Sequence, residues 1–236
     1  MGITFDLATS IFLLWLCIGM PYLAYVSYRK IKSGVPLPPK VKRFRTMVGL
    51  LLLTGWLADT AARSNGVELE FTPTFLGLLF GLSVAVGTVI GVVRGRHRQP
   101  ADHRERIRKL YAPTSTPEYL WAIAGGTCAG ICEEIAYRGV LLALLARLTE
   151  SLGIAIVLCV VFFVLAHLPQ GLRGAIGVGS LATIFHIVYA VTGSLLAPIM
   201  IHALYDIGIF TILFVDERRR AADPLLIEEA APQPAS

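Results

Sequence analysis

The stretch "CEEIAYRG", residues 132–139, places two carboxylates and a guanidinium inside a long apolar run. It is preceded by "YLWAIAGGTCAG" and followed by "VLLALLARL". An acidic or basic side chain at the centre of a membrane-spanning helix costs about 2.5–3.5 kcal/mol on insertion scales. We therefore expect Glu133, Glu134 and Arg138 to face one another or a water-filled cavity, rather than lipid.

The composition of the chain is that of an integral membrane protein. Of its 236 residues, 55% are hydrophobic and 16% are charged, and the mean hydropathy is +0.67. Soluble domains carry about 25% charged residues. Apolar windows of about 20 residues, enough to cross the bilayer as helix, recur along the chain, and the strand alternation of porins is absent. The sequence predicts an all-α fold, a polytopic membrane bundle of helices.

Eight apolar segments are expected to form the helices of this bundle. The segment at 140–149 is too short to span a membrane alone. The bundle therefore has seven transmembrane helices if 140–149 continues the preceding helix, and eight if it is a separate half-helix. The segments are residues 7–28, 46–62, 73–93, 117–137, 140–149, 151–168, 175–193 and 195–215.

The chain divides into three parts. Residues 1–116 hold the N-terminal transmembrane helices and their basic loops, and residues 117–215 hold the helices that include the charged stretch. Residues 216–236 end in an Ala- and Pro-rich sequence of little periodicity. Because such a composition buries little apolar surface, we expect a disordered cytoplasmic tail there.

The charges of the connecting segments predict the orientation in the membrane. Residues 29–45 are basic without an acid, residues 94–109 are basic with two acids, and residues 63–71 lean acidic. Because lysine and arginine are retained on the cytoplasmic side, the N-terminus is expected outside and both basic loops inside. The net charge of +5 then faces anionic membrane lipid, and a nucleic-acid partner is not expected.

Helix geometry assigns partners within the charged stretch. At about 100° per residue, Glu134 and Arg138 are separated by about 40° and can pair directly. Glu133 points about 140° away from Arg138. It is therefore the carboxylate without a local partner.

Four further polar side chains lie in apolar segments. His202 and Asp206 share one helix face, and His167 and His186 lie in two other segments. Any one of them alone is explained by a hydrogen bond between helices, and for His186 this packing role is favoured over a place at a site. Glu133, His167, His202 and Asp206 together, however, can converge on one buried water.

Such a group supports hydrolysis. A carboxylate and an imidazole that contact one water can remove its proton, and a second imidazole can stabilise the negative charge that forms on the attacked carbonyl oxygen. Alternatively, Glu133, His167 and His202 form the set of two histidines and one carboxylate that is typical of catalytic zinc (Zn²⁺).

Three motifs in chain order contain these residues. Their residues, which lie in three separate apolar segments, are Glu133, Glu134, Arg138, Phe163, His167, His202 and Asp206. This order of Glu-Glu-x-x-x-Arg, Phe-x-x-x-His and His-x-x-x-Asn or Asp resembles that of the CPBP family, the CAAX proteases and bacteriocin-processing intramembrane enzymes. The resemblance covers residues 117–215 and implies that this part is a catalytic helical core.

The resemblance implies an intramembrane endopeptidase whose substrate is a membrane-associated or lipidated peptide or protein. Glu133 would be the general base on the hydrolytic water, and His167 would share that water. A metal-free glutamate mechanism is favoured, and zinc bound by Glu133, His167 and His202 is the alternative.

The remaining motif residues would support this chemistry. Glu134 would be held by Arg138 and would tune the site, with Phe163 as structural support. His202 and residue 206 would stabilise the oxyanion. Position 206 departs from the eukaryotic CAAX enzymes, which usually have Asn there. An ionised Asp206 has no proton to donate, so it would act as a donor only when protonated, or else orient His202 or bind a metal.

Two other classes of protein also use buried carboxylates and histidines. A non-catalytic membrane scaffold or immunity protein would keep the polar cluster only to hold the bundle together. A proton-coupled transporter would use it as a relay, but the inverted repeat typical of transporters is absent from the sequence. Short loops and a compact length favour a prokaryotic plasma membrane as the location, with bacteriocin or peptide processing as the role.

Pairs of glycines four residues apart are expected to mark close helix packing rather than hinges. The pairs are Gly77/Gly81, Gly87/Gly91 and Gly126/Gly130.

Overall fold

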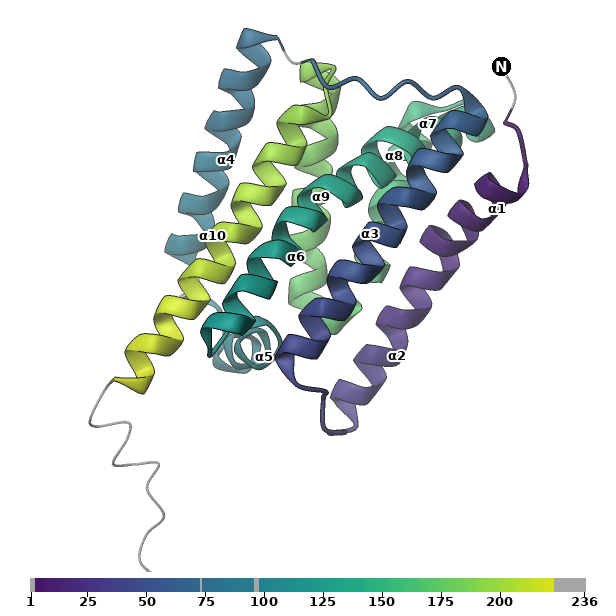
Figure 1. Cartoon of the computed structure of the whole chain (residues 1–236). Helices are drawn as coiled ribbons and strands as arrows, with labels where there is room; N and C mark the ends of the chain where they lie inside the picture. Colours follow the sequence, from purple (N-terminus) through teal and green to yellow (C-terminus); the bar gives the residue numbers. More distant parts are fainter. Residues whose placement is uncertain (1–2, 73, 96–97, 223–236) are drawn as a thin grey trace, which may run out of the picture.

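The computed structural model describes residues 3–72, 74–95 and 98–222, and its regular elements are all helical (Figure 1). The predicted all-α fold is confirmed for this part of the chain. In chain order the elements are α1 (Leu7–Leu14), the π-helical stretch η1 (Trp15–Gly19), α2 (Met20–Lys32), α3 (Lys40–Asn65), α4 (Phe75–Gly95), α5 (Ala101–Tyr111), α6 (Thr116–Glu134), the π-helical stretch η3 (Ile135–Leu141), α7 (Leu142–Thr149), α8 (Leu152–Ala166), the 3-10 turn η4 (Leu168–Gln170), α9 (Gly171–Thr192) and α10 (Leu196–Ala221).

Three helices of the described residues are long and apolar enough to cross a membrane by length and composition. They are Leu7–Lys32, Leu168–Thr192 and Leu196–Ala221, and Phe75–Gly91 and Leu152–Ala166 are shorter apolar helices. Helices that could span a membrane are thus present, whereas seven or eight crossings stay a prediction.

The short segment at 140–149 continues the helix that carries the charged stretch. α6, η3 and α7 follow one another without a break from Thr116 to Thr149. The chain then reverses at Glu150, which has a φ of 54°, and Ser151 caps α8 by accepting a hydrogen bond from the backbone N–H of Ile154. A separate half-helix at 140–149 is therefore not formed.

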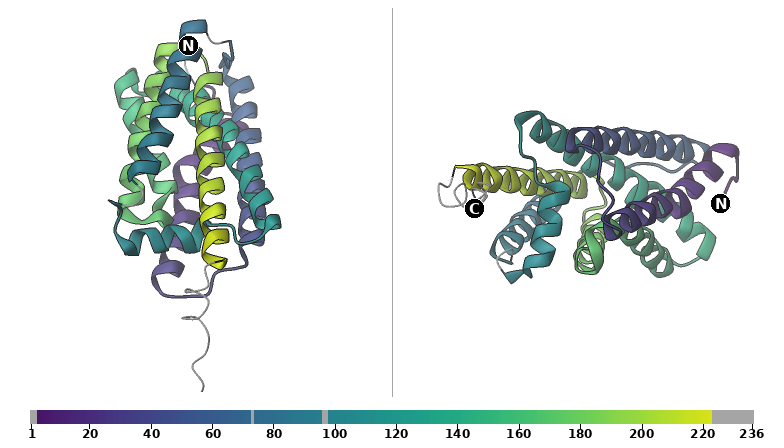
Figure 2. Two further views of the ribbon diagram at one scale, coloured as in Figure 1. Left: turned by 90° about the vertical axis from the view of Figure 1, so that its left-hand side faces the viewer. Right: turned by 90° about the horizontal axis from the view of Figure 1, so that it is seen from below.

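The helices form two layers. α3, α6 and α10 lie side by side, with α8 and α9 behind them (Figure 1, Figure 2). α6 and α10 approach closely because Gly126 and Gly130 have no side chain at their interface. A Cβ at Gly130 would lie 2.6 Å from the backbone nitrogen of Ala203, and one at Gly126 would lie 2.9 Å from the Cβ of Asp206. The predicted close packing is confirmed for this glycine pair.

The other two glycine pairs lie on α4 and differ from each other. A Cβ at Gly77 would lie 3.2 Å from Thr192, and one at Gly81 would lie 3.4 Å from Ala197. At Gly87 and Gly91, an added Cβ would meet nothing within 4 Å. The prediction of close packing is therefore wrong for the second pair, because that part of α4 has no neighbouring helix against these glycines.

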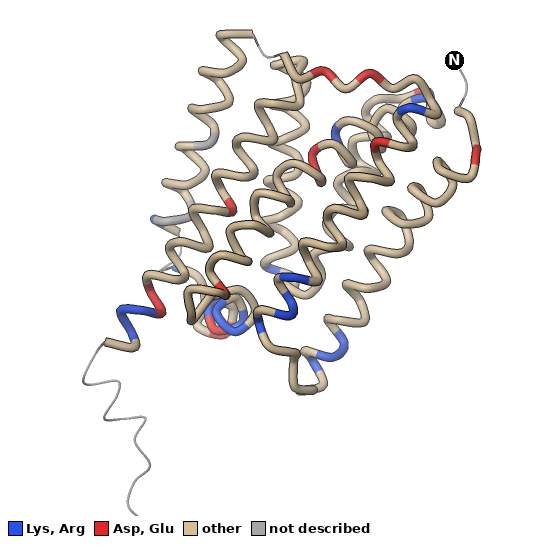
Figure 3. The backbone as a smooth tube through the Cα atoms, in the orientation of Figure 1, with Lys and Arg blue, Asp and Glu red and all other residues tan. Residues whose placement is uncertain are grey.

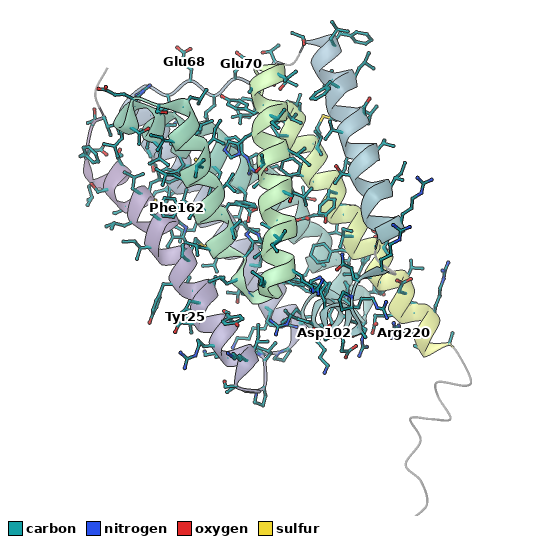
Figure 4. The ribbon with its side chains drawn as sticks, turned by 180° about the vertical axis from the view of Figure 1, so that it is seen from behind. Tyr25, Glu68, Glu70, Asp102, Phe162 and Arg220 are labelled. Atoms are coloured by element: carbon teal, nitrogen blue, oxygen red, sulfur yellow. The ribbon has the colours of Figure 1, made fainter. Side chains whose placement is uncertain are left out.

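The charged connections are separated to opposite ends of the bundle. Basic residues of 29–45, of α5 and of the end of α10 lie at one end (Figure 3). Glu68 and Glu70 lie at the opposite end from Asp102 and Arg220 (Figure 4). The two basic connections therefore share one side of the bundle, which the predicted orientation requires.

Part of the basic connection at 94–109 is a helix that the sequence did not predict. α5 lies across the basic end (Figure 1). The Arg108 guanidinium pairs with Glu105 in α5 at 2.7 Å and with Glu217 of α10 at 3.2 Å. The hydrogen bond from Arg108 lowers the pKa of Glu105 to about 2. These pairs stabilise a short polar helix that has little apolar surface to bury.

The first residues of the predicted tail are helical and form the end of α10. α10 extends to Ala221, so residues 216–221 are helical. Glu217 contacts Arg108 of α5 there, which gives this last turn a tertiary partner. The rest of the predicted tail, 223–236, lies outside the described residues.

Candidate active site

Glu134 and Arg138 form the ion pair that helix geometry predicts. Arg138 Nη1 donates to Glu134 Oε1 at 3.0 Å, and neither side chain is exposed. Arg138 Nη2 donates to the backbone oxygen of Ala182 in α9 at 3.0 Å. This pair lies where α6 passes into the π-helical η3, a kind of helix irregularity that is frequent at functional sites.

Two aromatic rings lie close to the Arg138 guanidinium. Its Cζ lies 5.0 Å from the ring centroid of Phe163 and 5.5 Å from that of Phe185. Contacts of this kind stabilise a cation in an apolar setting. Phe163, the first residue of the second motif, therefore contacts the guanidinium, and Phe185 is an additional neighbour that belongs to none of the motifs.

Glu134 also bonds His202 on α10, a contact that the sequence did not reveal. His202 Nδ1 lies 2.7 Å from the same Oε1 atom that accepts from Arg138. Because a carboxylate accepts hydrogen bonds, Nδ1 carries the proton and Nε2 points to the other side of the ring. A second partner could have been expected from the apolar sequence around Glu134, because a buried carboxylate needs more than one hydrogen-bond donor.

Glu133 stands apart from this pair. Its Oε2 lies 3.8 Å from His202 Nε2, and Asp206 Oδ2 lies 3.8 Å from the same nitrogen. Within the described residues, Glu133 Oε2 is buried without a hydrogen-bond partner from the protein. A separation of 3.8 Å is too long for a direct hydrogen bond and suits contact through a water. Glu133 is thus the carboxylate that Arg138 does not hold, as predicted.

His167 lies at the end of α8 with one ring nitrogen occupied. Its Nδ1 bonds the backbone oxygen of Phe163 at 2.7 Å. A carbonyl can only accept, so the neutral ring has an acceptor at Nε2. His167 therefore makes its hydrogen bond within its own segment, and its place at the hydrolytic water stays a prediction.

The side chains do not form a zinc site in this arrangement. Over the described residues, no group of three or more His, Cys, Asp or Glu side chains could hold a metal ion. The Nδ1 atoms of His167 and His202 both contact oxygen acceptors, which leaves the Nε2 atom of each ring for a water or another ligand. Zinc held by Glu133, His167 and His202 stays the alternative prediction, and we derive no step through a metal.

His186 lies behind the ion pair, on α9. It is 3% exposed, and its Nδ1 bonds the backbone oxygen of Ala182 at 2.8 Å. That oxygen also accepts from Arg138. His186 and Arg138 thus share the Ala182 oxygen as a hydrogen-bond acceptor. This agrees with the packing role favoured for His186.

Comparison with known proteins assigns the segment that carries these residues to a family. Residues 115–208 match the family model "Type II CAAX prenyl endopeptidase Rce1-like". The match covers about two fifths of the chain and includes all three motifs. Searches of curated proteins and of solved structures found no match. Helices apolar enough to span a membrane agree with a family of membrane proteases. Residues 115–208 are thus similar to the Rce1-like CAAX prenyl endopeptidases, which agrees with the resemblance of the three motifs to the CPBP family.

Proposed function

We propose that this protein is an intramembrane endopeptidase in which Glu133 activates the hydrolytic water. The observation that carries the proposal is the position of Glu133. Its Oε2 is buried, has no protein partner among the described residues and faces His202 Nε2 at 3.8 Å. A carboxylate held by an arginine would be a poor base, because its lone pairs would already be occupied.

In the first step, a water beside Glu133 Oε2 attacks the carbonyl carbon of the scissile peptide bond. Its proton moves to Glu133 as the carbon–oxygen bond forms. The resulting carboxylic acid then gives this proton to the departing amine nitrogen while the carbon–nitrogen bond breaks. The products are a carboxylic acid and an amine, and Glu133 ends as it began. His167 offers an acceptor at Nε2 that would help to orient the water.

His202 is the proposed stabiliser of the oxyanion. With Nδ1–H donated to Glu134 at 2.7 Å, the imidazole has a donor at Nε2 only when it is doubly protonated. The carboxylates of Glu133, Glu134 and Asp206 around the ring favour that charged form. Glu134 would fix the orientation of His202, as the carboxylate of a catalytic triad fixes its histidine.

The proposed substrate is a membrane-associated or lipidated peptide or protein. The name of the matching family model, CAAX prenyl endopeptidase, supports a substrate at the membrane surface. The burial of Glu133 and His202 among apolar helices supports entry of the substrate from the membrane. We propose a prokaryotic plasma membrane as the location, with the basic end of the bundle in the cytoplasm, in contact with anionic lipid.

The experiment that tests this function replaces Glu133 by glutamine in the producing cell. Glutamine keeps the shape of the side chain and removes the base, so membrane peptides that the enzyme normally cleaves should accumulate in quantitative peptidomics. Glu68→Gln, a change of the same kind at an exposed loop position, is the control and should leave the peptide profile as it was. If the two variants gave the same profile at equal protein levels, a non-catalytic scaffold would be the better description.

A further inference from the structure

The imidazole of His202 has one hydrogen bond from the protein within the described residues. Its Nδ1 donates to Glu134 at 2.7 Å, whereas its Nε2 lies 3.8 Å from Glu133 and from Asp206. A hydrogen bond at one ring atom fixes where that atom lies, but it constrains the tilt of the ring plane only weakly. Because a displacement of about 1 Å at a reacting group can cost about a hundredfold in rate, the direction of Nε2 matters as much as its distance.

Phe185 of α9 supplies a second contact to this imidazole. Its ring centroid lies 5.2 Å from that of His202, and the two ring planes are tilted by 40°. Ring pairs with centroids roughly 4.5–7 Å apart attract each other and have preferred relative orientations. Arg138 Cζ also lies over the Phe185 ring, 5.5 Å from its centroid. Phe185 thus contacts both His202 and the cation that is paired with Glu134.

The Phe185 ring is itself held in place. It is 2% exposed and belongs to a cluster of buried apolar side chains from α9 and α10. The other buried members of this cluster are Val188, Ala197 and Ile201. The helix is also attached to the ion pair, because Arg138 Nη2 donates at 3.0 Å to the backbone oxygen of Ala182, about one turn before Phe185. A close-packed ring on an attached helix is a rigid surface for a neighbouring side chain.

We propose that Phe185 is a positioning residue for His202. Glu134 fixes the imidazole at Nδ1, and Phe185 fixes the tilt of its plane, so Nε2 keeps its direction toward the side of Glu133 and Asp206. This inference rests on the proposed function, in which Nε2 stabilises the oxyanion. It gives α9, which carries no residue of the three motifs, a role in the orientation of the site.

Two substitutions at Phe185 separate this role from the filling of space. Leucine removes the ring and leaves a smaller apolar side chain. Methionine is close to phenylalanine in volume and is flexible, so it refills the space without a flat, rigid surface. We expect both Phe185→Leu and Phe185→Met to lose between about tenfold and a hundredfold in kcat, with KM within about threefold of wild type. A methionine variant with the kcat of wild type would overturn the proposal, because filled space alone would then suffice.

Phe12→Leu on α1 is the matched control, because Phe12 is also a buried ring, at 0% exposure. Loss of a buried ring leaves a cavity, so the unfolding temperature in detergent should fall for Phe12→Leu and for Phe185→Leu alike. The rate is measured below both unfolding temperatures, on a peptide that accumulates in Glu133→Gln cells. We expect kcat to fall only for Phe185→Leu. Equal losses of kcat in the two leucine variants would mean that lost stability explains the effect, which would contradict a positioning role.

A second measurement does not depend on peptidase activity. Nitrogen-15 NMR of histidine-labelled protein reports whether the His202 ring has one orientation, and comparison with His202→Gln identifies its signals. We expect one narrow set of signals in wild type and in Phe12→Leu, and broadened or doubled signals in Phe185→Leu and Phe185→Met. Equally narrow His202 signals in all four proteins would refute the proposal. If Glu133→Gln left peptide cleavage intact, the proposed function would fail, while this measurement would still test whether Phe185 orients His202.

Discussion

Arg138 combines the electrostatic and packing roles of the site in one side chain. Its guanidinium donates to Glu134 and to the backbone of Ala182 and lies close to the rings of Phe163 and Phe185. Lysine could not reproduce this arrangement, because its ammonium group lacks the planar fork and the flat face of arginine. The charge of Arg138 also makes it possible to bury Glu134, since removing one partner of a buried pair leaves the other uncompensated.

The role of Asp206 can be tested by two substitutions at this one position. A quarter of its side chain is accessible, more than for Glu133 or His202, and its Oδ2 lies 3.8 Å from His202 Nε2. Asp206→Asn replaces the carboxylate by an amide that can donate to an oxyanion. We expect kcat to stay within about tenfold of wild type, whereas Asp206→Leu, which has no polar group, should lose roughly a hundredfold or more.

Steady-state kinetics on one peptide substrate can compare the two variants of Asp206. Equal losses in both would mean that the negative charge itself is required. Asp206 would then act by holding His202 in its charged form, and a donor at this position would play no part.

Contacts within one helix were predictable from the sequence, and contacts between helices were only partly so. The pairing of Glu134 with Arg138 follows from spacing alone. The bond from His202 to Glu134 depends on the register between α6 and α10, which a single sequence does not contain. The three motifs predicted that these helices meet, but not that His202 would contact Glu134.

At the scale of elements, the close approach of α6 and α10 sets the geometry of the site. It depends on Gly130, where an added Cβ would lie 2.6 Å from the backbone of Ala203. Backbone atoms cannot move aside as a flexible side chain does. We therefore expect Gly130→Ala to push α10 away from α6, to destabilise the protein by about 1–3 kcal/mol and to weaken the bond between Glu134 and His202.

Gly87→Ala is the matched control for this prediction, because an added Cβ there meets nothing within 4 Å. Thermal unfolding in detergent and the cleavage rate should both fall for Gly130→Ala and stay near wild type for Gly87→Ala. Equal unfolding midpoints for the two variants would show that the contact between α6 and α10 tolerates a larger separation.

Two features of the helices could not be read from apolar patterns. The segment at 140–149 is joined to α6 through the π-helical η3, and hydropathy does not distinguish a continuous helix from two helices with a short break. α5 is polar throughout most of its length and is fixed by pairs such as Arg108–Glu217. Such a helix depends on tertiary partners, so its sequence alone resembles that of a loop.

At the scale of the whole molecule, the two ends of the bundle differ in charge, and this asymmetry predicts its orientation. Glu68 lies at one end and Asp102 lies at the other, on α5 (Figure 4). If the basic end is cytoplasmic, a membrane-impermeant thiol reagent applied to intact cells should label Glu68→Cys and leave Asp102→Cys unlabelled until the cells are opened. The reverse pattern would invert the proposed topology and place α5 outside.

The central claim is that Glu133 is the general base and that no metal is needed. Its most direct test is the turnover number of purified Glu133→Gln, compared with wild type after both proteins have been freed of metal and checked by elemental analysis. We predict that metal-free wild type cleaves its peptide at the full rate, and that Glu133→Gln is slower by about a hundredfold to ten-thousandfold at an unchanged unfolding temperature. A wild-type enzyme silenced by metal removal and restored by zinc, or a glutamine variant within tenfold of wild type, would contradict the account.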